Sequence, residues 1–287
     1  MIGGSNFVAV RYSNEELAPY WGAGLRFALA MVLLLAVTGV MRLPLPTGRA
    51  LTATALYGVL SIGISYALLY WALVSAPAVF ASVVLALVPL LTLLLAAAQG
   101  LEHLTRRGLA GGAIAIAGIA LVFGEQLRLD VPLASGLAAL GGAVCVAQAN
   151  VVAKRLPRLH IVPVNTVAFA AGAVVLLAMS LVAGEPRALP QRPEIWIALA
   201  YLVVLGSIGL FGLFLYVLGR LTASATSYVL VLAPIVTVTL GALLRSEPVT
   251  ATLLAGAVLV GIGVYLGAIT HASRSAPTPP PARHAVR

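Results

Sequence analysis

The sequence reads SVVLALVPLLT over residues 82–92 and SYVLVLAPIVT over residues 227–237, 145 positions later. The same spacing relates the longer stretches Leu73–Leu121 and Leu218–Leu266. Apolar stretches share leucine and alanine by chance, but they rarely share a mid-helix proline, a charged turn and spaced glycines in one order. The sequence therefore predicts an internal repeat. The pairs that punctuate both copies are Pro89 and Pro234, Glu102 and Glu247, Thr105 and Thr250, and Gly118 and Gly263.

The composition predicts a polytopic α-helical membrane protein. Of the 287 residues, 61% are hydrophobic and 9% are charged, whereas a soluble domain carries about 25% charged residues. Apolar runs of about 20 residues, the span of a bilayer core, recur along the chain. The net charge of +9 does not indicate a nucleic-acid partner, because the basic residues lie between the apolar runs. Cys145 is the only cysteine and is expected to be a small buried side chain.

We expect ten transmembrane segments, the first of them short. Met1–Tyr12 would cover about 18 Å of a core about 30 Å thick. Residues 1–125 and 132–270 then form two five-helix halves, and the proline-rich residues 271–287 form a disordered tail. The nine full-length segments are Pro19–Met41, Ala50–Val74, Pro77–Ala98, Gly108–Gly124, Pro132–Ala153, Ile161–Ala183, Ile195–Leu218, Ala223–Leu244 and Thr250–Ile269.

The loop charges predict that both termini are cytoplasmic. In that orientation the inner loops and the tail hold eleven Lys and Arg residues, and the outer loops hold five. An odd number of helices per half places the two copies in opposite orientation. In transporters, such an inverted repeat places the substrate site near the midplane between the halves.

Three amides lie within the expected helices. Asn6 and Asn150 are 144 positions apart, and Gln148 lies close to Asn150. An amide facing lipid is costly, so these side chains are expected to face protein or a cavity. They are candidate substrate contacts, and a helix–helix hydrogen bond is the alternative.

Several motifs resemble a known transporter family. The chain begins with SNFVAVR at residues 5–11, continues with APYWGAGLRF at residues 18–27, and carries the paired prolines. In these features it is similar to the drug/metabolite transporter superfamily. More narrowly, it resembles the EamA-type ten-helix carriers, which include YddG-type aromatic amino-acid exporters. The resemblance implies a carrier that exports a small metabolite.

Arg26 occupies the position of that family's arginine on the second helix. A charge within a membrane helix is expensive unless it snorkels or pairs. Arg26 is about seven residues from the expected outer end of its helix, so it is expected to snorkel toward Glu15 or Glu16. The alternative is that it contacts a substrate carboxylate.

Aromatic residues mark the third and eighth helices. Tyr66 and Tyr70 share one helix face, and Trp71 follows them. We expect them to line a substrate pocket, although aromatic residues near helix ends also form interfacial belts. Their counterparts 145 positions later are Phe211, Leu215 and Tyr216, of which Tyr216 is a further candidate substrate contact.

Pro89 and Pro234 lie within apolar helices and remove a backbone donor. Paired helix breaks at corresponding positions of two halves point to a transporter binding site. Ser82 and Ser227 precede the prolines by two turns on the same face and are candidate substrate contacts. Purely structural kinks are the alternative.

Small residues form a seam on two helices. Such spacing permits close helix contact, so the seam is expected either to pack the two halves together or to form a homodimer; otherwise the protein is a monomer. The seam residues are Gly108, Gly111, Gly112, Ala115 and Gly118, and then Gly256, Gly263 and Gly267.

Catalytic and metal-binding patterns are missing from the sequence. All eight Asp and Glu residues fall in expected loops or helix ends, and neither HExxH nor GxxxxGK[ST] occurs. We therefore expect no enzyme activity, cofactor or metal. The expected function is export of a neutral or aromatic amino acid across a bacterial inner membrane, by facilitated diffusion. Drug or nucleoside export, proton coupling, and a non-transporting scaffold remain alternatives.

Overall fold

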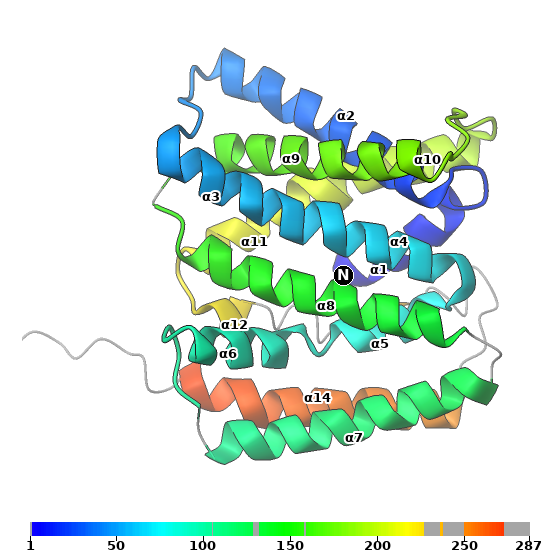
Figure 1. The fold of residues 1–287 in the computed structure, drawn as a ribbon, viewed down its shortest axis with the longest axis vertical. Helices are drawn as coiled ribbons and strands as arrows, with labels where there is room; N and C mark the ends of the chain where they lie inside the picture. Colours follow the sequence, from blue (N-terminus) through cyan, green and yellow to red (C-terminus); the bar gives the residue numbers. More distant parts are fainter. Residues whose placement is uncertain are drawn as a thin grey trace, which may run out of the picture.

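The protein is an all-helical bundle in the part of the chain that the structure describes (Figure 1). The computed structural model describes residues 2–104, 106–128, 132–157, 159–226, 236–237 and 250–272. The helices are α1 (Ile2–Ser13), α2 (Pro19–Val40), α3 (Gly48–Gly58), η1 (Val59–Ile64), α4 (Ser65–Ser75), α5 (Ala78–Leu85), α6 (Val88–Ala98), α7 (Arg106–Arg128), α8 (Leu133–Lys154), α9 (Ile161–Val182), α10 (Pro193–Val203), η2 (Val204–Gly209), α11 (Leu210–Leu218), α12 (Ala223–Thr226) and α14 (Ala251–Ala272).

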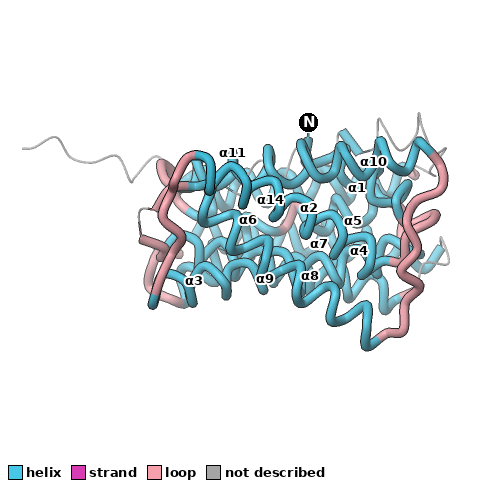
Figure 2. Tube along the Cα trace, turned by 90° about the horizontal axis from the view of Figure 1, so that it is seen from above, coloured by secondary structure: helices cyan, strands magenta, loops and turns pink. Residues whose placement is uncertain are grey.

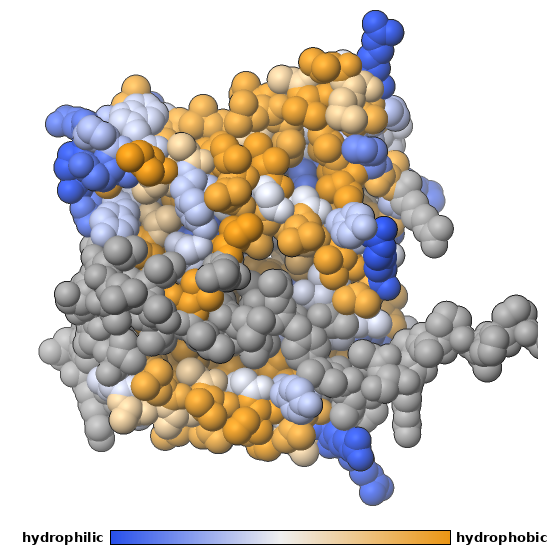
Figure 3. Space-filling view, turned by 180° about the vertical axis from the view of Figure 1, so that it is seen from behind, coloured by the Kyte–Doolittle hydropathy of each residue, from blue (hydrophilic) through white to orange (hydrophobic). Residues whose placement is uncertain are grey.

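Long apolar helices make this a multi-pass membrane protein. In the described residues, six continuous helical segments, here called rods, are long and apolar enough to cross a bilayer. Two of them join several labelled helices: α3, η1 and α4 form one rod, and α10, η2 and α11 form another. The connecting loops gather at the two ends of the bundle (Figure 2). On the face shown in Figure 3, apolar side chains make up most of the coloured surface, and hydrophilic ones gather toward its left and right edges. Large apolar side chains are exposed along the rods, as on a lipid-facing surface; examples are Val32, Ile116, Val174, Val182 and Ile197.

Corresponding helices of the two predicted halves pack side by side. α2 lies along α9, and α7 lies along α14 (Figure 1). The contact between α7 and α14 is close because glycines face backbone: a Cβ on Gly118 would lie 2.8 Å from the Gly256 carbonyl, and one on Gly263 would lie 2.4 Å from the Gly111 carbonyl. These seam glycines therefore meet within one chain.

Pro89 does more than kink its helix. The predicted single segment Pro77–Ala98 consists of two helices, because α5 ends at Leu85 and α6 begins at Val88, with Pro89 in its first turn. A tight turn joins them, with Leu87 N donating to Val84 O. Proline lacks the donor that an unbroken helix would need here. Pro234 lies outside the described residues.

Two π-helical segments interrupt the third and eighth predicted helices. η1 and η2 begin 145 positions apart, at Val59 and Val204, which is the spacing of the sequence repeat. A π segment widens the helix and changes which backbone groups are bonded. The apolar runs in the sequence predict uninterrupted helices here, and nothing in them indicates either π segment.

Several predicted boundaries also change. α7 continues to Arg128, so most of the expected linker after residue 124 is helical. α14 continues to Ala272, two residues into the expected tail; the rest of the tail lies outside the described residues. Of the predicted Ala223–Leu244 helix, only α12 and residues 236–237 are described.

Candidate functional site

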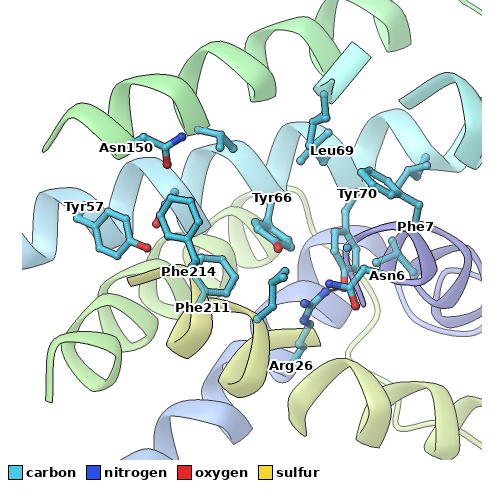
Figure 4. A pocket seen from close by; sticks show the side chains of 17 residues that line it. Asn6, Phe7, Arg26, Tyr57, Tyr66, Leu69, Tyr70, Asn150, Phe211 and Phe214 are labelled. Carbon is cyan, nitrogen blue, oxygen red and sulfur yellow. Dashed lines mark hydrogen bonds between the residues drawn. The ribbon is translucent and has the colours of Figure 1, made fainter. Parts of the chain in front are cut away.

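A cavity lies in the middle of the bundle, between helices from both ends of the chain (Figure 4). Its volume is about 110 Å³, several times the 10–15 Å³ that one water molecule needs. The lining is mostly apolar, with a few polar groups, as is usual for small-molecule sites. The polar and aromatic side chains around it are Asn6, Phe7, Arg26, Tyr57, Ser61, Tyr66, Tyr70, Asn150, Phe211 and Phe214.

Arg26 forms one end of this cavity and is fully buried. Its Nε donates to Ser207 Oγ at 2.8 Å, and its Nη2 donates to the Gly206 carbonyl at 2.8 Å. Its Nη1 donates to the Tyr70 hydroxyl at 3.3 Å. The guanidinium also lies 5.2 Å from the ring centroid of Tyr66, within cation–π range. These partners fix the guanidinium at the cavity wall.

The prediction that Arg26 snorkels toward Glu15 or Glu16 is wrong. Both carboxylates bind Arg192, each at 2.6 Å. Among the described residues, no carboxylate pairs with Arg26, whose hydrogen-bond partners there are all neutral. A buried charge is normally paired, so this end of the cavity is suited to an anionic group.

The π segment η2 supplies the hydrogen-bond acceptors that keep the Arg26 guanidinium in the interior of the bundle. Within η2 the Gly206 carbonyl accepts from both Arg26 Nη2 and Asn6 Nδ2, the latter at 3.2 Å. Ser207 Oγ donates to the Leu202 carbonyl, five residues earlier. A Cβ at position 206 would lie 2.4 Å from Asn6 Oδ1, so any larger residue there would require the Asn6 side chain to shift.

Aromatic rings form the central walls of the cavity. Tyr66 packs edge-on against Phe27, with centroids 4.7 Å apart, and faces Phe211 at 6.3 Å. Phe211 also contacts Phe169 at 5.5 Å. Such rings offer large apolar contact areas and favour stacking with another ring.

A second polar group lines the end of the cavity away from Arg26. Tyr57, Ser61 and Asn150 come from α3, η1 and α8, and Figure 4 shows Tyr57 and Asn150 on the far side of Tyr66 from Arg26. Asn150 Nδ2 donates to Thr92 Oγ1 at 3.3 Å. The cavity thus has a cationic end, an aromatic middle and a neutral polar end.

The structure brings together five of the predicted site residues. All five lie at the cavity described above: Asn6, Arg26, Tyr66, Tyr70 and Asn150.

The other predicted contacts lie elsewhere. Trp71 and Tyr216 are 41% and 49% exposed on the outside of the bundle. Ser82 is buried and donates to the Val79 carbonyl of its own helix. Gln148 accepts from Gln99 Nε2 at 2.9 Å. Ser227 lies outside the described residues.

Several residues around the cavity were not among the predicted substrate contacts. Tyr57 lies one turn before Ser61, on the helix that carries Tyr66, and that periodicity was the available signal. The repeat pointed to Phe211, and Phe214 follows it by three residues on the same face. Nothing in the sequence signalled Gly206 and Ser207, because their role depends on the π segment.

Polar contacts tie the two halves together at the end where α2 begins. Glu185 accepts from the backbone N–H groups of Tyr20 and Trp21, at 3.1 and 2.8 Å, and so caps α2. Arg192 binds Glu15 and Glu16. Its hydrogen bond lowers the pKa of Glu16, and both carboxylates raise the pKa of Arg192.

A different set of contacts ties the halves at the opposite end. Glu102 accepts from the backbone and the hydroxyl of Ser224, at 3.3 and 2.5 Å. Arg155 donates to the Gln99 carbonyl at 3.0 Å. Lys154 Nζ donates to the Leu218 carbonyl at 2.9 Å, a contact within the second predicted half. Polar contacts thus join the two predicted halves at both ends of the bundle.

The described residues contain no group of three or more His, Cys, Asp or Glu side chains that could hold a metal ion. The cavity instead resembles a binding site for a small organic molecule.

Comparisons with known proteins agree with this geometry. A crystal structure titled "Crystal structure of protein" superposes with a TM-score of 0.69 over 94% of this chain and 96% of its own, at 19% identity, and so shares the fold. The chain is 32% identical to the "Uncharacterized inner membrane transporter YedA" of Escherichia coli K12, covering 93% of this chain and 89% of YedA. It is 29% identical to a "Probable amino-acid metabolite efflux pump" of Salmonella typhimurium LT2, covering 93% and 91%.

The model of the EamA-like transporter family matches residues 1–124 and 134–268, nearly the whole chain in two blocks. The family and the names of these relatives indicate a transporter rather than an enzyme. The chain belongs to the EamA-like transporter family.

Proposed function

We propose that the protein exports amino acids with aromatic or large neutral side chains across the bacterial inner membrane. The observation that carries this proposal is Arg26, a buried guanidinium at the cavity whose partners among the described residues are all neutral. A substrate carboxylate would supply the opposite charge, in the paired geometry that arginine favours. The rings of Tyr66 and Phe211 would then contact the substrate side chain.

Further observations support the proposed direction of transport and the proposed class of substrate. The Salmonella relative is named as an efflux pump for amino-acid metabolites, and the E. coli relative as an inner membrane transporter. Residues 1–125 and 132–270 form two inverted repeats of five membrane segments, with both termini and the 271–287 tail in the cytoplasm. The two matched blocks, the two π segments and the loop charges support this arrangement.

Transport proceeds by alternating access. The halves rock about the cavity, and the contacts at one end break while those at the other hold. Transport is facilitative, because the described cavity lining holds no carboxylate or histidine that could carry a proton. The working unit is a monomer, since the seam glycines of α7 and α14 pack against each other within one chain.

Uptake into proteoliposomes tests this function. The panel contains tryptophan, phenylalanine, leucine, charged amino acids and nucleosides, each with and without a pH gradient. We expect saturable uptake of the aromatic and large neutral amino acids, independent of the gradient. Trp71→Leu is the matched control for variants of the cavity, because Trp71 adjoins Tyr70 but is exposed.

Two outcomes would overturn parts of the proposal. Uptake that rises with an imposed pH gradient would contradict the facilitative mechanism. Saturable uptake of nucleosides without amino acids would replace the substrate class and leave the transporter assignment intact.

A further inference from the structure

The polar group at the far end of the cavity is unexplained by an amino-acid carboxylate. Tyr57 is 1% exposed and Ser61 is 5% exposed, yet both line the cavity. Figure 4 shows Tyr66, Phe211 and Phe214 between Tyr57 and the Arg26 end. A substrate carboxylate held by Arg26 would therefore leave this end to the tip of the substrate side chain.

The Ser61 hydroxyl has an unmet hydrogen-bonding requirement. Its Oγ is buried and has no hydrogen-bond partner within the part of the chain that is described. The Tyr57 hydroxyl lies near Ser61 Oγ but falls short of hydrogen-bond geometry with it. A buried hydroxyl without a partner costs free energy, and a ligand group with a donor or acceptor would remove that cost.

The local backbone holds these hydroxyls in place. Tyr57 precedes Ser61 by one turn, and Ser61 belongs to η1. The Ser65 hydroxyl donates to the Ser61 carbonyl at 2.6 Å, which fixes the π turn. A Cβ on Gly58 would lie 2.3 Å from the Ala168 carbonyl, so this part of the rod is pressed against α9. The site is therefore preorganised.

The spacing also suits a single aromatic amino acid. Ser61 lies nine residues before Tyr70, which contacts Arg26. At 1.5 Å per residue this is about 13 Å along the rod. Side chains at each end shorten that gap, and the rings of Tyr66 and Phe211 line it.

We propose that Tyr57 and Ser61 recognise a hydrogen-bonding group at the tip of the substrate side chain, so that the carrier prefers tyrosine and tryptophan to phenylalanine. This inference rests on the proposed function. The phenol hydroxyl of tyrosine or the indole N–H of tryptophan would pair with the Ser61 and Tyr57 hydroxyls. Phenylalanine would leave the Ser61 hydroxyl without a partner, and a polar site of this kind discriminates against a ligand that lacks the polar group.

Competition experiments in proteoliposomes test the inference. Unlabelled tyrosine, tryptophan and phenylalanine compete against uptake of labelled tryptophan, and the inhibition constants are compared. We expect tyrosine and tryptophan to bind about three- to tenfold more tightly than phenylalanine, the range expected for one neutral hydrogen bond. In the double variant Tyr57→Phe/Ser61→Ala the three constants should become equal, with the phenylalanine constant unchanged.

Tyr265→Phe is the matched control, since it removes the same hydroxyl from an exposed tyrosine of α14. This variant should keep the preference. Equal constants in the unmodified protein, or an equal loss for all three ligands in the double variant, would overturn the inference while leaving amino-acid transport in place. If none of the three amino acids is taken up or competes, both the inference and the proposed function fail.

Discussion

Tyr66 and Phe211 hold equivalent positions in the two sequence repeats, 145 residues apart, and their rings face each other with centroids 6.3 Å apart. Each follows a π segment, since η1 ends at Ile64 and η2 ends at Gly209. The repeat therefore brings its own counterparts together at the cavity.

Replacing the Tyr66 ring should weaken transport. Tyr66→Ala removes its contacts with Phe27, Phe211 and the bound side chain. Each aromatic pair is worth about 0.5–1.5 kcal/mol beyond area burial, so the KM for tryptophan should rise about tenfold. Tyr66→Phe keeps the ring and should stay within about threefold. Initial rates of uptake measure both, and equal losses in the two variants would assign the effect to the hydroxyl instead.

Arg26 should decide whether a carboxylate is recognised. Arg26→Gln removes the charge that we assign to that group. Hydrogen bonds to charged groups contribute about 1.5–3 kcal/mol, so tryptophan affinity should fall about ten- to a hundredfold. Inhibition by tryptamine, which lacks the carboxylate, should change little. If the affinities for tryptophan and tryptamine fell equally, Arg26 would maintain the shape of the cavity and would not bind the carboxylate.

The sequence predicted the helices better than it predicted the contacts between them. Apolar runs and the 145-residue repeat locate most helices within a few residues. The burial of Asn6 and Asn150 follows from the cost of exposing an amide to lipid. Arg26 shows the limit of this reasoning, because its distance from the helix end favours snorkelling. One of its actual partners is the Gly206 carbonyl, 180 residues away within a π segment.

The ion pair between Arg192 and Glu16 should depend on pH in a defined direction. Arg192 lowers the pKa of Glu16 in the folded protein. A lowered folded-state pKa adds stability above the ordinary carboxylate value, about 4.3, and that contribution is lost as the pH falls through the lowered value. Arg192→Gln should therefore lower Tm slightly at pH 7, and this effect should disappear once the pH falls below the lowered pKa of Glu16.

Arg187→Gln is the control for this prediction, because Arg187 is an exposed residue of the same loop. It should not reproduce the pH dependence. Both residues are exposed, so the difference should also shrink in about 1 M salt, where the Debye length is about 3 Å. A Tm difference that persists below the lowered pKa of Glu16 would mean that Arg192 stabilises the loop without its carboxylate partners.

A side chain at position 206 should disturb both Asn6 and Arg26. In Gly206→Ala, the new Cβ would lie 2.4 Å from Asn6 Oδ1 and 3.1 Å from Arg26 Nη2. Both side chains would have to move, and overpacking of this kind costs about 1–3 kcal/mol. Tm should fall, and tryptophan uptake should fall with it, since Arg26 loses its carbonyl partner.

Gly212→Ala provides the contrast on the same rod, because nothing lies within 4 Å of a Cβ there. Alanine is favoured over glycine inside a helix by roughly 0.5–1 kcal/mol, so this variant should keep or raise Tm and retain uptake. If Gly206→Ala matched Gly212→Ala in both Tm and uptake, the η2 carbonyl would not position Arg26. If only uptake fell in Gly206→Ala, the Asn6–Gly206–Arg26 contact would matter for binding and not for stability. A fall in both is the expected result, because one carbonyl holds α1 and α2 against η2 and also orients the guanidinium toward the cavity.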